Sequence, residues 1–425
     1  MGSMTLLKND GILPLRKDKI KKIAVIGPHA DNARMFFGGY THISMMESIY
    51  AVANSIAGVA GIENTTGKTI PTVPGTDIQL DQGEEYDAIL RTQKPDCPSL
   101  LEYLKAYAPS CEIVYAKGYD IAGQDQSGFD EALQMIGQAD LAILTLGGKY
   151  GTCSLASMGE GVDATDINLP ECQDAFIEQA AEIGKPLVGV HIFGIPISSD
   201  IADEKLHAIL EAWNGAECGA EAIVQTLFGE NDPAGRLPVS VAYKSGQIPI
   251  YYNHPWGSAE SQSGSIGFAN YVDMSHSPRY PFGHGLSYAE FYYRDLHIEN
   301  REVDTMGDIV CSFFLKNVSD CAGDEVVQIY VSDRFASRTR PVMELAAFER
   351  IPLQPHEEKE IICHISPSQL AFLDKDMKWK IEKGDIDLLI GASSKDIRLK
   401  DSIRITENAW IDGRDRRFYG KVEVK

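Results

Sequence analysis

Short apolar runs alternate with amphipathic segments over residues 20–230, and this alternation limits the folds that are open to the chain. The apolar runs have the length of buried strands, and the segments between them space their apolar side chains as helices do. Strands that alternate with helices predict an α/β three-layer sandwich with a mainly parallel sheet. The predicted strands are 23–27, 113–115, 141–146, 187–192 and 208–213, and the predicted helices are 98–108, 126–138, 170–184 and 220–227.

The character of the sequence changes after residue 229. Glycine, proline and tyrosine are dense as far as 290, which predicts an ordered, irregular connector, because the segment is too apolar and aromatic for a disordered linker. Beyond 291 the helical spacing ends, and strand-length runs such as 309–315 and 325–331 predict an all-β sandwich of the fibronectin type III-like kind. The predicted parts are the α/β domain at 1–235, the connector at 236–290 and the β-sandwich at 291–425.

The formal net charge of −22 over 425 residues excludes a nucleic-acid partner, because phosphate would be repelled. No apolar stretch approaches the roughly 20 residues of a membrane span, so no membrane partner is expected. The histidines and the eight cysteines form no HExxH or CxxC pattern, and we expect neither a metal nor a cofactor. Scattered cysteines and the lack of a secretory signal predict a cytoplasmic protein with reduced thiols, whose natural start is expected to lie before Met1.

Parallel sheets place their ligand sites beyond the carboxyl ends of the strands, and three loops of this chain qualify. They are 27–32, 147–166 and 213–216. The second is long for such a connection and holds Glu160 between two glycines, which offers a carboxylic acid on a flexible loop. Most loop carboxylates are only solvated, so the residues alone leave this role open. Asp163 and Asp166 are alternative proton donors, although capping of the helix near Pro170 is the simpler interpretation.

Several motifs in a fixed order resemble glycoside hydrolase family 3, the β-glucosidase and β-xylosidase group. The resemblance extends over essentially the whole chain. The segments that carry it are Leu6–Leu15, Ile23–Asn32, Gly159–Asp163 with Leu169–Pro170, Asn231–Pro238 and Tyr280–Tyr288.

This resemblance implies that Glu160 is the catalytic acid/base of a retaining β-glycosidase, most often a β-glucosidase. Such enzymes use two carboxyl groups, one as the nucleophile and one as the acid/base. Tyr150, Cys153 and Met158, on the same loop as Glu160, are the candidate substrate-binding residues, with Tyr150 and Cys153 expected at the mouth of the pocket. A β-glucoside or an oligosaccharide would be the substrate, and assembly into a homo-oligomer is left open.

Family members usually begin with a TIM barrel that carries the nucleophilic aspartate. About 230 residues of α/β pattern are too few for such a barrel together with a sandwich domain. Ser332-Asp333 imitates the nucleophile motif, but it follows a strand of the β-sandwich and is rejected. We therefore expect the chain alone to be inactive and the barrel to be supplied by another domain or subunit. A β-xylosidase and a non-catalytic carbohydrate-binding or scaffold protein are the alternatives.

Overall fold

The computed structural model describes residues 1–54, 71–80, 84–258, 260 and 270–425. It divides the chain into two compact units. The first consists of Met1–Gly235 and Tyr243–Gly246, and the second of Arg236–Ala242 and Gln247–Lys425. The separate connector at 236–290 stays a prediction.

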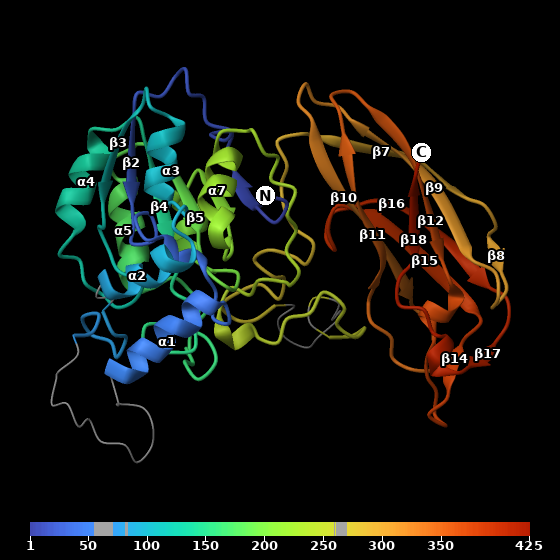
Figure 1. Cartoon of the computed structure of the whole chain (residues 1–425). Coiled ribbons are helices and arrows are strands. Elements are labelled where there is room, and N and C mark those ends of the chain that lie inside the picture. Colours follow the sequence, from blue (N-terminus) through green and yellow to red (C-terminus); the bar gives the residue numbers. More distant parts are fainter. Residues whose placement is uncertain (55–70, 81–83, 259, 261–269) are drawn as a thin grey trace, which may run out of the picture. The chain divides into compact units, whose positions relative to one another are not determined.

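A six-stranded sheet forms the centre of the first unit, with the strand order β1-β6-β5-β4-β2-β3 (Figure 1). All strands from β2 to β6 pair in parallel, and β1 pairs antiparallel with β6 at one edge. The predicted mainly parallel sheet is therefore confirmed. The strands are β1 (Thr5–Asn9), β2 (Lys22–Ile26), β3 (Glu112–Ala116), β4 (Leu141–Leu146), β5 (Leu187–His191) and β6 (Ala208–Glu211).

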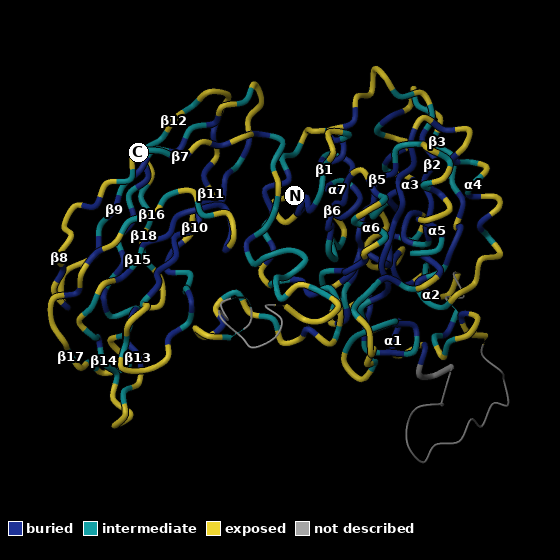
Figure 2. Tube along the Cα trace, turned by 180° about the vertical axis from the view of Figure 1, so that it is seen from behind, coloured by how far each residue is buried: buried dark blue, intermediate teal, exposed yellow. Residues whose placement is uncertain are grey.

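Helices lie in layers on this sheet, because α3 packs with α7, while α4 packs with α5 and α5 with α6. All six residues of β4 are buried, as a strand covered on both faces requires, and Figure 2 shows burial concentrated on these central strands. The helices are α1 (His42–Asn54), α2 (Glu84–Gln93), α3 (Leu100–Tyr107), α4 (Phe129–Gly137), α5 (Glu171–Ala181), α6 (Asp200–Lys205) and α7 (Gly219–Leu227).

Two local features set the ends of these elements. Ser99 and Glu102 form a capping box at the start of α3. The strand predicted over 208–213 ends at Glu211, because Trp213 takes a left-handed backbone conformation with φ of 57°.

The second unit is built of β-sheets, as the sequence predicts for the residues beyond 291. Its sheets have the orders β11-β10-β15-β16-β8, β18-β12-β9-β7 and β13-β14-β17. Residues along β9 alternate strictly between buried and half-buried, and the buried apolar ones join the core of this unit. The strands are β7 (Phe291–Ile298), β8 (Glu302–Val303), β9 (Ile309–Asn317), β10 (Gly323–Asp333), β11 (Glu344–Leu353), β12 (Glu358–Ile365), β13 (Phe372–Leu373), β14 (Trp379–Ile381), β15 (Gly384–Gly391), β16 (Ile397–Ile405), β17 (Ala409–Ile411) and β18 (Lys421–Val424).

Candidate active site

The loop after β4 folds back on itself and presents Glu160 at the tip of a tight turn. The loop has two neighbouring legs, residues 149–151 and 157–159. They are joined by backbone hydrogen bonds, from Gly151 N to Met158 O at 3.0 Å and from Ser157 N to Lys149 O at 2.9 Å. Two more hydrogen bonds close the turn, from Gly159 N to Val162 O at 2.9 Å and from Val162 N to Gly159 O at 3.1 Å. Glu160 and Gly161 are the residues between, and the side chain of Glu160 is exposed.

The glycine that precedes Glu160 is required by the close approach of the two legs. A Cβ at Gly159 would lie 1.8 Å from the carbonyl oxygen of Gly151, and the φ of 152° at Gly159 also disfavours other residues. Gly161 has a φ of 71°, which again favours glycine. The Gly-Glu-Gly sequence is therefore explained by a paired turn that fixes where the carboxyl group stands.

Two of the three predicted substrate-binding residues lie beside this turn. Tyr150 and Met158 are bridge partners on the opposing legs, and both are half-buried. The ring of Tyr150 meets Phe193 edge to face, with 6.3 Å between the ring centroids. Cys153 is buried inside the loop, with only 5% of its surface exposed, so a sugar could reach its thiol only after local opening. The substrate-binding role of all three stays a prediction.

The two aspartates that follow Glu160 do not cap the next helix, so that interpretation was wrong. Pro170 is the N-cap of α5 and makes no side-chain capping bond. Asp166 instead accepts hydrogen bonds from the backbone of Ile167 at 2.7 Å and of Asn168 at 3.2 Å, which fixes a local turn. Asp163 is exposed.

A buried ion network that the sequence did not reveal anchors the start of the Glu160 loop. Glu47, on the inner face of α1, accepts a hydrogen bond from Arg34 Nη1 at 2.6 Å and pairs through its other oxygen with Lys149 Nζ. Arg34 Nε also lies 2.8 Å from Asp87 Oδ1. The side chains of Arg34, Glu47 and Lys149 are exposed by 1%, 1% and 4%. Lys149 begins the first leg of the loop, so this network ties the loop to α1.

His29 joins the loop after β2 to the loop after β4. It is fully buried, and its Nε2 lies 2.9 Å from the carbonyl oxygen of Gly148. The carbonyl is an acceptor only, so Nε2 carries the proton. Burial lowers the pKa of His29 to about 4.

This lowered pKa predicts a loss of stability in acid. The unfolded chain takes up a proton near the ordinary histidine pKa of 6.5, whereas folded His29 does so near 4. Stability contributed by neutral His29 is complete above pH 6.5 and is lost as the pH falls towards 4, by about 3 kcal/mol in total. Denaturation in urea between pH 7 and pH 4 measures this, and His29→Asn should show a correspondingly shallower pH dependence. If the free energy of unfolding fell equally steeply with pH in the wild type and in His29→Asn, His29 would not be the source of the acid sensitivity.

A sequence model of the glycosyl hydrolase family 3 C-terminal domain matches residues 4–288, which is more than half of the chain. The chain belongs to glycoside hydrolase family 3. A model of the fibronectin type III-like domain matches residues 325–394.

Family 3 relatives align over almost the whole of this chain. The periplasmic β-glucosidase of Salmonella typhimurium is 32% identical over 93% of the chain, and a β-xylosidase of Formosa agariphila is 32% identical over 94%. The crystal structure of a β-glucosidase from Listeria innocua covers 95% of the chain with a TM-score of 0.75 and 26% identity. The alignments take up 48% of each of these three proteins, so the chain spans about half their length.

In this family 3 chain, the surroundings of Asp333 are those of a structural residue. It ends β10 in the second unit, and Arg340 Nε lies 3.9 Å from its carboxylate. Burial raises the pKa of Asp333, with the charge of Arg340 acting in the opposite direction. Its place in the β-sandwich agrees with the rejection of Asp333 as a nucleophile.

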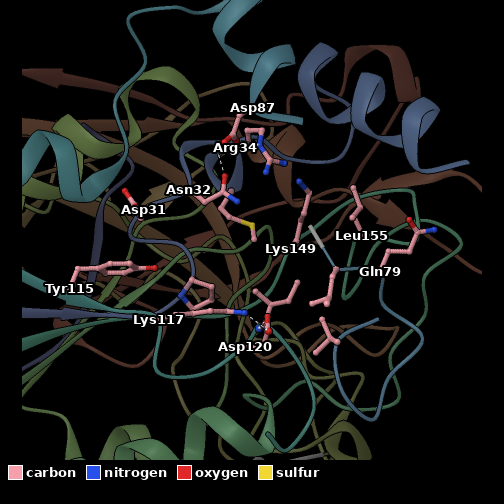
Figure 3. Close-up of a pocket in the computed structure, with 15 residues that line it drawn as sticks. Asp31, Asn32, Arg34, Gln79, Asp87, Tyr115, Lys117, Asp120, Lys149 and Leu155 are labelled. Atoms are coloured by element: carbon pink, nitrogen blue, oxygen red, sulfur yellow. Dashed lines mark hydrogen bonds and ion pairs between the residues drawn. The ribbon is translucent and has the colours of Figure 1, made fainter. Parts of the chain in front are cut away.

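Two cavities open near the carboxyl edge of the family 3 α/β unit. One, of about 470 Å³, runs along the loop that holds Glu160, and Met158, Asp163 and Phe193 are in its wall. The other, of about 300 Å³, is shown in Figure 3. Glu160 itself lines neither of them, because it stands at the exposed tip of its turn. In the described part of the chain, no group of three histidine, cysteine or acidic side chains is placed to hold a metal ion.

Proposed function

We propose that this chain is the acid/base-bearing part of a retaining β-glycosidase, with Glu160 as the proton donor. The observation that carries the proposal is the paired turn that holds Glu160 outward between two glycines. Membership of family 3 supports it, since relatives of this chain are named β-glucosidase and β-xylosidase. Glu160 would protonate the leaving oxygen and then deprotonate the attacking water, while an aspartate nucleophile forms the glycosyl-enzyme.

We propose further that the nucleophile comes from a TIM barrel that packs over the Glu160 turn. An exposed acid can serve such a reaction only if a second body closes over it and excludes water. The turn projects from the first unit, which leaves it accessible to such a partner. The chain covers about half of its relatives, so the remaining half of such a protein has room for a barrel.

An apolar patch beside the turn supports this partner. It consists of the exposed side chains Tyr40, Met45, Ile49 and Tyr50 on and just before α1, and we call it the α1 patch. Ser48 on α1 lies 3.2 Å from Thr152 in the Glu160 loop, hydroxyl to hydroxyl, so the helix is adjacent to the loop. Exposed apolar groups next to a reactive carboxyl are typical of a surface that another domain covers.

Charged substitutions in the α1 patch should weaken binding of the barrel. Met45 and Ile49 lie one helical turn apart on the exposed face, so Met45→Glu with Ile49→Glu places two charges in the proposed interface. We expect the dissociation constant to rise by at least about tenfold, since each desolvated charge costs more than 1.4 kcal/mol. Met306→Glu is the control, because Met306 is 90% exposed in the second unit. If both variants bound the barrel equally well, the α1 patch would not be part of the interface.

The substrate is proposed to be a terminal β-linked glucose, with β-xylose as the alternative that the Formosa relative supports. The test measures hydrolysis of 4-nitrophenyl β-glucoside and β-xyloside by the chain alone and together with a co-expressed family 3 barrel. We expect turnover only with the barrel. Robust turnover by the pure chain would refute the division of the site. No turnover in any combination would favour a non-catalytic carbohydrate-binding or scaffold protein.

We place the protein in the cytoplasm as part of this proposal. All eight cysteines are free in the structure, and four of them are exposed or half-buried thiols. None of the helices that the structure describes could span a membrane. The Salmonella relative is named periplasmic, so fractionation of cells that express the native gene is the deciding measurement.

A further inference from the structure

Two buried cysteines lie directly opposite each other in the second unit. Cys311 on β9 pairs in register with Cys363 on β12, and the two strands are antiparallel neighbours in the sheet β18-β12-β9-β7. These residues are exposed by 1% and 0%, and both belong to the apolar core of the unit. Directly opposite residues point to the same face of a sheet, so the two thiols enter the core side by side.

The backbone spacing at this pair suits a disulfide bond. Asn317 N donates to Glu357 O at 2.9 Å, and opposite residues exchange hydrogen bonds at every second position, so Cys311 and Cys363 also form a hydrogen-bonded pair. The Cα atoms of such a pair are about 5.5 Å apart, within the range of about 4.4–6.8 Å that disulfides span. Their Cβ atoms are about 4.5–5.5 Å apart, so β9 and β12 must approach by about 1 Å to form the bond.

Both cysteines are free thiols in the structure, and the folded unit protects them. Contact with the thiol of Cys311, together with burial, raises the pKa of the Cys363 thiol well above its usual range. The thiolate is the nucleophile in thiol–disulfide exchange, so a buried pair of this kind reacts slowly. Exchange therefore takes place while the unit folds or opens, when the core does not cover the two strands.

We propose that Cys311 and Cys363 form a cross-strand disulfide when the second unit folds in an oxidising compartment. The oxidant is a small disulfide such as glutathione disulfide. The thiolate of Cys311 attacks one of its sulfurs, which releases the first glutathione thiolate and leaves a mixed disulfide. The thiolate of Cys363 then attacks the Cys311 sulfur and releases the second. Two protein thiols are oxidised, one glutathione disulfide is reduced, and the two thiol protons pass to the released glutathione.

The bond changes the stability of the second unit. It closes a loop of about 50 residues, and a cross-link of this length restricts the unfolded chain. In a reducing compartment both thiols persist and pack as small apolar side chains. The stability of the second unit thus depends on the compartment, and this dependence involves neither Glu160 nor the proposed catalytic role.

Refolding of the full chain, with and without a mixture of glutathione and glutathione disulfide, tests the proposal. Free thiols are blocked with iodoacetamide, and the tryptic peptides are identified by mass spectrometry. We expect a peptide that links Cys311 to Cys363 only after refolding with glutathione disulfide. In calorimetry, the melting temperature of the second unit should be higher in the oxidised than in the reduced protein by roughly 5–15 °C.

Cys172→Ala is the matched control for Cys311→Ala, because Cys172 is fully buried in the first unit. Cys172→Ala should keep both the linked peptide and the higher melting temperature, and Cys311→Ala should lose both. Three outcomes would overturn the proposal: absence of the linked peptide in the oxidised wild type, linkage of either residue to another cysteine instead, or an equal rise in melting temperature in Cys311→Ala. If Cys311→Ala does not fold, the peptides of the wild type decide.

Discussion

Replacement of Glu160 by glutamine should abolish most of the activity that the chain gains with its barrel. Glutamine keeps the size of the side chain but cannot release a proton to the leaving oxygen. General acid/base catalysis contributes roughly 10²–10⁴-fold, so kcat for 4-nitrophenyl β-glucoside should fall by about that factor. A 2,4-dinitrophenyl leaving group needs no protonation, and its release should be much less affected. The measurement is the rate of the initial burst of phenol release for both substrates, because Glu160 is also the base of the second step and its loss slows the later turnovers of both.

Asp163→Asn is the matched control for this substitution. Asp163 is exposed on the same loop, three residues beyond Glu160, and is the alternative proton donor. We expect kcat to stay within about threefold of the wild type, which is less than 1 kcal/mol. If Asp163→Asn lost activity while Glu160→Gln retained it, the roles of the two carboxyl groups would have to be exchanged.

Glu47→Ala should cause a large loss of stability in the first unit. It leaves Arg34 and Lys149 with buried charges that no longer have this carboxylate between them. Removal of one partner from a buried ionic group costs about 3–5 kcal/mol. Calorimetric melting measures the effect, and the transition of the first unit should shift to lower temperature.

The control is Glu112→Ala, which removes the partner of Lys22 on the surface of the same sheet. That pair is 2.8 Å apart, and the Glu112 side chain is 63% exposed. Exposed pairs contribute about 0–1 kcal/mol, so this variant should melt almost as the wild type does. A similar small shift in both variants would mean that the Glu47 network does not hold the fold. A large shift for Glu47→Ala alone supports the view that α1 and the Glu160 loop are tied through this carboxylate.

The sheet of the first unit could be predicted because its strands are continuous apolar runs. Leu141–Leu146 can only be buried on both faces, and the helical spacing around it requires covering helices. Strand β1 and helix α1 were not predicted. Five residues of β1 give too little pattern for a strand, and the helix α1 mixes buried, charged and exposed apolar positions. Both elements take their place from tertiary pairing.

Glu160 could be found from its sequence context, whereas the groups that position it could not. A carboxyl between two glycines is visible in the sequence, and the family resemblance gives it a role. The anchoring network joins Glu47 to Arg34 and to Lys149, which is 102 residues away along the chain. Each is an ordinary charged residue in sequence, and only the fold brings them together.

Trapping of the glycosyl-enzyme by azide tests the role of Glu160 most directly. In Glu160→Ala with its barrel, the acid/base is missing, and the space it leaves admits a small anionic nucleophile. With an activated aryl β-glucoside, added azide should restore turnover and yield the β-glucosyl azide, identified by NMR, because retaining enzymes attack the sugar twice. Restored turnover with the β-azide is the result that we predict. No acceleration by azide, or an α-configured product, would contradict Glu160 as the acid/base of a retaining glycosidase.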